Sequence, residues 1–135
     1  MDVFTKEKRS EIMARIRAKN TKAERIVFRY LRNNKVYFRK HYKRVAGCPD
    51  VALPRKKTAV FIDGDFWHGR DFAKRKCRLP EYWKSKIETN MKRDRRNRRA
   101  LVLAGWRIMR VWEKDLLKCQ ELYCGEIKSF LAGAA

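Results

Sequence analysis

The chain has 135 residues, of which 36 are Lys or Arg and 15 are Asp or Glu, so its formal net charge at pH 7 is +21. This length is enough for one domain with a hydrophobic core and too short for two, so we expect a single domain over residues 1–135. The charge favours a polyanionic partner, nucleic acid above all, over an inert basic surface or an anionic membrane.

The lack of long apolar runs and the spacing of the cysteines indicate the cellular compartment and argue against two kinds of cysteine site. No apolar run approaches the roughly 20 residues that span a bilayer, and the first ten residues lack a secretory apolar segment, so we expect a soluble, cytoplasmic protein. The four cysteines form no Cys-x-x-Cys pair. This argues against a disulfide framework and against a zinc knuckle.

Helices are predicted where apolar residues recur at helical spacing. Pro80 suits the start of the longest helix, and Gly105 suits the position just after its end. The segment between 69 and 79 is basic and irregular. The expected helices cover residues 5–18, 21–34, 80–104 and 116–131.

Strands are predicted over residues 36–39, 49–53, 58–63 and 106–112. Pro54 and a basic turn separate the second strand from the third, which predicts a hairpin. A helix that joins a strand to a later neighbouring strand crosses one face of the sheet. The order therefore predicts an α/β fold with a mixed central sheet flanked by helices.

Two aspartates mark the same end of the predicted hairpin. Asp50 opens one strand and Asp63 closes the other, so antiparallel pairing brings their carboxylates together. Mg²⁺ prefers carboxylates, waters and phosphate oxygens as ligands, which suits a nucleic-acid substrate. The alternative is that both residues only terminate strands beside Pro49 and Gly64, which are common turn residues.

Two histidines and one glutamate are further candidates for catalytic residues. His68 follows Asp63 by five residues and could take a proton from an attacking water at neutral pH. The alternative is a histidine that contacts phosphate or is partly buried. His41 has no acidic neighbours in the sequence and is interpreted as a backbone contact at most. Glu24 either faces the sheet edge or only completes a capping box with Thr21.

Two polar residues of the predicted long helix and three aromatic residues in or before it are further candidate site residues. Asn90 and Asp94 lie one turn apart near the apolar face, where they either orient another group or occupy edge positions. Phe66, Trp67 and Trp83 have no clear place in the periodic pattern of the core. Rings beside a basic groove can stack on bases or wedge between them, whereas the alternative is core packing of the loop. Three rings around a basic loop favour DNA contact.

Five stretches of the chain together resemble the very-short-patch repair (Vsr) endonucleases, a branch of the PD-(D/E)XK nuclease superfamily. The resemblance covers nearly the whole length. It implies a restriction-endonuclease-like core and a Mg²⁺-dependent DNA endonuclease that leaves 3′-hydroxyl and 5′-phosphate ends. The stretches are RSEIMARIRAKNTKAE at 9–24, GCPDVAL at 47–53, AVFIDGDFWHG at 59–69, YWKSKIETNMKRD at 82–94 and LVLAGWRIMRVWE at 101–113.

The resemblance also implies roles for particular residues. Asp50 and the main-chain carbonyl of Ile62 would hold Mg²⁺, His68 would be the catalytic histidine, and Glu24 would lie near the active centre. Asp63 stands where some relatives have a second histidine, and we expect it to support the metal directly or through water. The implied DNA contacts are Phe66, Trp67 and Trp83 at a T:G mismatch, the polar pair Asn90 and Asp94, and basic residues of 69–78 and 92–99, among them Arg70, Lys74 and Arg75.

The sequence departs from the family at a structural zinc site. Many relatives build that site from a cysteine before F-W-H, Cys or His residues after it and a cysteine after W-E. Asp65, Arg70 and Lys114 occupy these positions here, so we expect no structural zinc.

The sequence leaves three alternatives open for the substrate and activity of the protein. We expect a monomer that acts on double-stranded DNA, with mismatched DNA as the leading substrate and mismatch-repair proteins as candidate partners. The chain also resembles a related group of homing endonucleases that have a similar nuclease core with Glu, Asp, His and Asp landmarks, so site-specific cleavage of undamaged duplex is the rival activity. A non-catalytic DNA- or RNA-binding module is the third reading. The homing landmarks would be Glu24, Asp50, His68 and Asp94.

Overall fold

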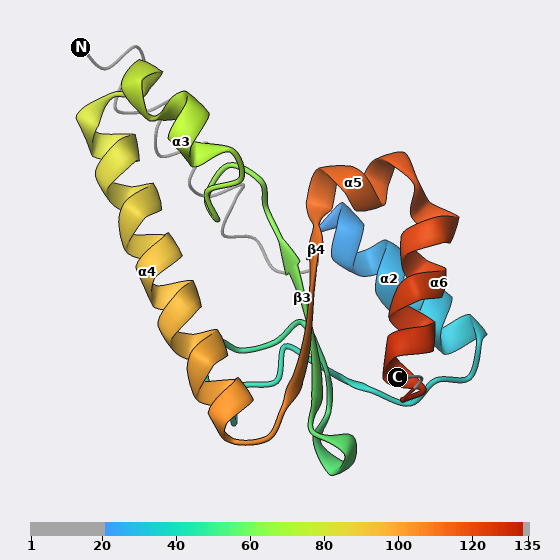
Figure 1. The fold of residues 1–135 in the computed structure, drawn as a ribbon. Helices are drawn as coiled ribbons and strands as arrows, with labels where there is room; N and C mark the ends of the chain where they lie inside the picture. Colours follow the sequence, from blue (N-terminus) through green and yellow to red (C-terminus); the bar gives the residue numbers. More distant parts are fainter. Residues whose placement is uncertain (1–20, 134–135) are drawn as a thin grey trace.

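A four-stranded mixed sheet separates two groups of helices in the computed structural model, which describes residues 21–133 (Figure 1). The sheet order is β1-β2-β3-β4, with antiparallel pairing up to β3 and parallel pairing between β3 and β4. This confirms the predicted α/β class and mixed sheet. The strands are β1 (Arg39–Lys40), β2 (Val51–Leu53), β3 (Thr58–Asp63) and β4 (Arg107–Trp112).

Helices cover both faces of the sheet. One long helix, α4, lies on one face, and α2, α5 and α6 lie on the other (Figure 1). Because α4 joins β3 to its parallel neighbour β4, it is the expected crossover helix. The helices are α2 (Lys22–Asn33), α3 (Phe72–Arg75), α4 (Glu81–Leu103), α5 (Glu113–Lys118) and α6 (Gln120–Leu131), with short 3₁₀ turns at Pro54–Lys56 and Lys76–Arg78.

The predicted helix bounds hold for α2 and α4. Thr21 caps α2 through a capping box with Glu24. Pro80 precedes the first residue of α4, and Gly105, at φ +87°, follows its C-cap. The predicted helix over 116–131 is wrong as a single element, because Cys119 (φ −132°, ψ 65°) breaks it into α5 and α6. The predicted helix over 5–18 lies outside the described residues.

The predicted hairpin of β2 and β3 is confirmed, with Val51 opposite Val60. Its turn passes through Pro54–Lys56 and then Lys57 at φ 47°. The first predicted strand is shorter and later than expected, because only Arg39 and Lys40 pair with β2.

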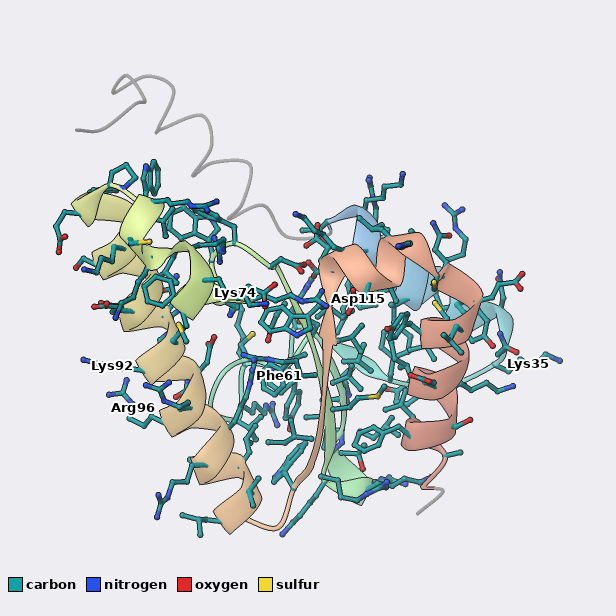
Figure 2. The ribbon with its side chains drawn as sticks, turned by 45° about the horizontal axis from the view of Figure 1, so that its top comes forward. Lys35, Phe61, Lys74, Lys92, Arg96 and Asp115 are labelled. Carbon is teal, nitrogen blue, oxygen red and sulfur yellow. The ribbon has the colours of Figure 1, made fainter. Side chains whose placement is uncertain are left out.

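Strand β3 is buried along its whole length because helices cover both of its faces. Val60 and Ile62 pack with α2 and α6, whereas Ala59 and Phe61 pack with Leu101 of α4. Figure 2 shows Phe61 between α4 and the sheet. Because strand β3 is held between two layers of helices, the residues at its carboxyl end have a defined position.

Within residues 21–133, every helix falls short of the combined length and hydrophobicity that a bilayer-spanning helix needs.

Candidate active site

The carboxyl end of β3 opens onto a cleft of about 850 Å³. Its walls come from the start of α2, the loop before β2, the loop after β3, the middle of α4 and the start of α5. Six acidic or histidine side chains that line it form the core of the candidate site: Glu24, His41, Asp50, Asp63, His68 and Asp94.

Asp50 lies at the hairpin end where the sequence predicted it. Its Oδ2 accepts a hydrogen bond of 2.7 Å from the main-chain N–H of Ile62, which fixes the carboxylate across the hairpin. Burial raises the pKa of Asp50 to about 7, and the negative charges of Glu24 and Asp63 add to the rise. A cation at Asp50 would offset this repulsion, so the surroundings of Asp50 suit metal binding.

Glu24 serves both of the roles that the sequence left open. Its Oε2 accepts a hydrogen bond of 2.9 Å from the Thr21 hydroxyl within the capping box. Its Oε1 contacts Nε2 of His41, which also lies 3.9 Å from Oδ1 of Asp50. His41 therefore has acidic neighbours in space that its surroundings in the sequence do not indicate. Its acidic partners come from α2 and the start of β2, and no local sequence signal brings them together.

His68 lies in the loop after β3, as predicted, and Asp94 of α4 orients it. Nδ1 of His68 is 2.5 Å from Oδ2 of Asp94 and 3.8 Å from Oδ1 of Asp63. Burial alone would lower the pKa of His68, but the hydrogen bond to Asp94 and the charge of Asp63 outweigh it and raise the pKa. Because a carboxylate can only accept, Nδ1 donates to Asp94 and Nε2 is left to accept a proton.

Asp63 is engaged by two arginines instead of standing open to a metal. Its Oδ2 accepts hydrogen bonds from Nη2 of Arg98 at 2.7 Å and from Nε of Arg110 at 2.6 Å. The Arg98 guanidinium also lies 4.4 Å from the ring centre of Phe61. A metal at Asp63 would have to compete with both ion pairs, and no local pattern in the sequence predicts these pairs.

The candidate DNA-contacting rings are packed together in a cluster below the His68 loop. Trp83 is 1% exposed and Trp67 is 6% exposed, with their ring centres 5.2 Å apart. Phe66 is partly buried against both. For Trp67 and Trp83 the structure favours the core-packing alternative, because Phe72 and Ile87 complete an apolar cluster around them.

Asn90 and Asp94 hold two consecutive residues of the loop. The Asn90 side-chain amide donates to the main-chain oxygen of Trp67 at 3.2 Å, one residue before the histidine that Asp94 holds. Both residues are buried on the same stripe of α4 as Trp83. This geometry favours the orienting alternative over a direct DNA contact.

Comparison with known proteins decides the family. A family model described as DNA mismatch endonuclease Vsr matches residues 1–74. The type II nicking enzyme V.HpaIIP of Haemophilus parainfluenzae is 41% identical over 132 residues, which cover 95% of this chain and 94% of the relative. The type II nicking enzyme V.NmeDIP of Neisseria meningitidis is 36% identical over 121 residues, covering 87% and 82%. The DNA mismatch endonuclease Vsr of Escherichia coli is 32% identical over 114 residues, covering 83% and 73%.

The chain belongs to the Vsr family. This membership confirms the resemblance that the five sequence stretches indicated, and with it the prediction of a DNA endonuclease. The site geometry described above is therefore that of a Vsr family member.

A network of ion pairs and hydrogen bonds joins Asp65, Arg70 and Lys114, the three residues that the sequence places at the expected zinc positions. Nη1 of Arg70 donates to Oδ2 of Asp65 at 2.9 Å and to Oδ1 of Asp115 at 2.8 Å. The main-chain N–H of Lys114 donates to Oδ1 of Asp65 at 3.0 Å. The network ties the His68 loop to α5.

The basic residues predicted to contact DNA differ in their surroundings. The Arg70 side chain is held by Asp65 and Asp115, and Arg75 donates to the main-chain oxygen of Arg70 at 2.8 Å. Lys74 on α3 is exposed. Lys92 and Arg96 point away from the sheet on the outer side of α4 (Figure 2). Among these five, Arg70 and Arg75 line the cleft.

Gly69 gives a direct test of how closely the His68 loop packs on α4. It has φ +78°, and a Cβ at this position would lie 2.3 Å from Sδ and 2.6 Å from Cγ of Met91. Gly69→Ala should lower the free energy of unfolding by about 1–3 kcal/mol, because backbone strain and the clash add. Urea denaturation measures this change.

The matched control is Gly125 of α6, where an added Cβ would meet nothing within 4 Å. Gly125→Ala should raise the free energy of unfolding by about 0.5–1 kcal/mol, because alanine is the better helix former. Equal effects of the two substitutions would contradict the packing described for Gly69.

Proposed function

We propose that this protein is a Mg²⁺-dependent endonuclease that nicks duplex DNA at or beside a T:G mismatch during very-short-patch mismatch repair. The observation that carries the proposal is the convergence of Asp50 and of the His68–Asp94 pair in one cleft of a Vsr family chain. The net charge of +21 supports a polyanionic substrate.

The residues at the end of the hairpin fit a divalent cation. Asp50 has one oxygen fixed by the Ile62 N–H, and its other oxygen faces the cleft residues Glu24 and His41. Asp50 and the main-chain carbonyl of Ile62 would hold Mg²⁺. The ion supplies electrostatic stabilisation of the charge that develops on the scissile phosphate and the leaving oxygen.

The chain's own contribution to the chemistry is proton transfer. Nε2 of His68 accepts a proton from the attacking water, while Asp94 holds the ring through Nδ1 and stabilises the imidazolium that forms. Asp63, held by Arg98 and Arg110, places a second negative charge near Nδ1. We assign Asp63 to the support of His68 and not to the metal.

Cations at the cleft rim should hold the DNA backbone. Lys114 is exposed and lines the cleft, whereas Lys92 lies on the outer side of α4 (Figure 2). Lys114→Ala should weaken binding and reduce the slope of log K against log salt by about 1. Lys92→Ala is the matched control and should leave the slope unchanged. Fluorescence anisotropy of a labelled duplex over a salt series measures both.

The result that would contradict this placement is a loss of slope in Lys92→Ala with none in Lys114→Ala. That result would put the DNA on the outer side of α4, away from His68.

A second candidate is site-specific cleavage of undamaged duplex. The observation that favours it is that Glu24, Asp50, His68 and Asp94, the four landmarks of the related group of homing endonucleases, all line the cleft. Duplexes that differ only in T:G against C:G at one position, set in several flanking sequences, separate the two candidates. We expect nicking of the T:G duplex alone, and equal nicking rates would remove the mismatch specificity.

A further inference from the structure

We propose that His41 is a ligand of the catalytic cation, together with Glu24 and Asp50, and that its imidazole makes the site bind Mn²⁺ more tightly than Mg²⁺. The inference rests on the proposed metal-dependent function and names the ligands on the side of the cleft opposite the proton-transfer pair. It adds His41, for which the sequence indicates no catalytic or metal role.

The donor atoms of the three residues converge. One ligand atom each from Glu24, His41 and Asp50 lies within 4.8 Å of the other two. Nε2 of His41 donates a hydrogen bond to Oε1 of Glu24 and lies 3.9 Å from Oδ1 of Asp50, so a bound cation would take the place of the proton that Nε2 and Oε1 share. Two carboxylates and one imidazole form a mixed oxygen and nitrogen donor set, which suits a divalent transition-metal ion.

Each carboxylate is aimed by a hydrogen bond to its other oxygen. Oδ2 of Asp50 accepts from the Ile62 N–H, so Oδ1 is the oxygen turned toward His41. Oε2 of Glu24 accepts from the Thr21 hydroxyl, so Oε1 is turned the same way. Supporting hydrogen bonds of this kind orient metal ligands in proteins. The capping box of α2 thereby fixes the glutamate for the site.

The backbone of His41 is held in a conformation that few residues adopt. Its φ is +46°, in the left-handed region, and its N–H donates to the main-chain oxygen of Asp50 at 3.0 Å. The ring packs edge-on against Phe28 of α2, with 5.6 Å between the ring centres. A non-glycine residue in this region indicates a local constraint. Here the constraint directs Nε2 at the two carboxylates.

The opposite wall of the cleft offers a weaker set of ligands. Asp63 is tied to Arg98 and Arg110, and Nδ1 of His68 is tied to Asp94. A cation there would meet two guanidinium charges. The described part of the cleft is thus divided into a cation side with Glu24, His41 and Asp50 and a proton-transfer side with His68 and Asp94.

Electron spin echo spectroscopy of the full-length protein loaded with Mn²⁺ tests the ligand directly, because a coordinated imidazole nitrogen modulates the echo. The chain has two histidines, so His41→Gln and His68→Gln assign any signal. We expect the nitrogen modulation in wild type and in His68→Gln, its replacement by the ¹⁵N pattern in ¹⁵N-histidine protein, and its loss in His41→Gln. Samples with and without a nicked product duplex are compared.

Binding titrations give a second readout. Wild type should bind Mn²⁺ at least about tenfold more tightly than Mg²⁺, and His41→Gln should lose most of that difference, because Mg²⁺ depends on the oxygen ligands. Circular dichroism checks that each variant is folded. If His41→Gln does not fold, labelled wild type and labelled His68→Gln still decide whether His41 coordinates the ion.

Three results would overturn the inference: Mn²⁺ bound without nitrogen modulation, modulation that persists in His41→Gln, or modulation lost in His68→Gln. With wild type still nicking in Mg²⁺, each would leave the proposed function standing. If wild type binds neither ion in the cleft and nicks in EDTA, both the inference and the proposed metal dependence fail.

Discussion

Replacing His68 with glutamine should slow nicking by about 10²–10⁴-fold, because the variant has no group to accept the proton of the attacking water. DNA affinity should stay near that of wild type, since Asp94 holds the His68 side chain inside the cleft and His68 is not one of the exposed cations proposed to hold the DNA backbone. Single-turnover nicking with enzyme in excess over a T:G duplex measures the chemical step, and anisotropy measures the affinity.

Asp94→Asn should also slow nicking, but by less than His68→Gln, because an amide can hold His68 in the wrong tautomer. Glu81→Gln, on the exposed first turn of α4, is the matched control and should nick like wild type. Full activity of His68→Gln would show that the proton acceptor lies elsewhere, and reduced DNA binding alone would make His68 a phosphate contact.

Trp83→Ala should lower the free energy of unfolding by about 3–5 kcal/mol, the usual cost of removing a large ring from a packed core. Trp83 is 1% exposed and packs against Trp67, Phe66 and Ile87, with the ring of Tyr82 edge-on to it, so the substitution leaves a cavity beside the His68 loop. Urea denaturation followed by linear extrapolation measures the change.

Tyr82→Ala is the control from the same turn of α4. Tyr82 is 43% exposed, and its removal should cost about 1 kcal/mol or less. A Trp83→Ala variant as stable as wild type but unable to bind a T:G duplex would contradict the core assignment and restore the ring to the DNA surface.

The helices and strands were predictable where residues within the same segment mark their ends. Thr21 and Glu24 mark the start of α2, and Pro80 and Gly105 mark the ends of α4. The hairpin followed from two short apolar runs around Pro54. The break at Cys119 was missed because apolar spacing continues across it while the backbone leaves the helical region.

The site was predictable only in part, because its decisive contacts join distant segments. Asp50 and His68 could be chosen from their places beside predicted strands. The partners of His41 and Asp63 could not, since Glu24 comes from α2, Arg98 from α4 and Arg110 from β4, and these elements meet only in the folded sheet. The burial of Trp83 likewise depends on a loop whose path no periodic pattern describes.

The central claim is that a cation held at Asp50 and a proton acceptor at His68 together nick DNA. The most direct test is the nicking rate of wild type and Asp50→Asn on a T:G duplex in Mg²⁺ and in EDTA, with circular dichroism to confirm the fold. We predict rapid nicking by wild type in Mg²⁺, none in EDTA, and none by Asp50→Asn in either. Nicking by Asp50→Asn at the wild-type rate, or by wild type in EDTA, would contradict the account.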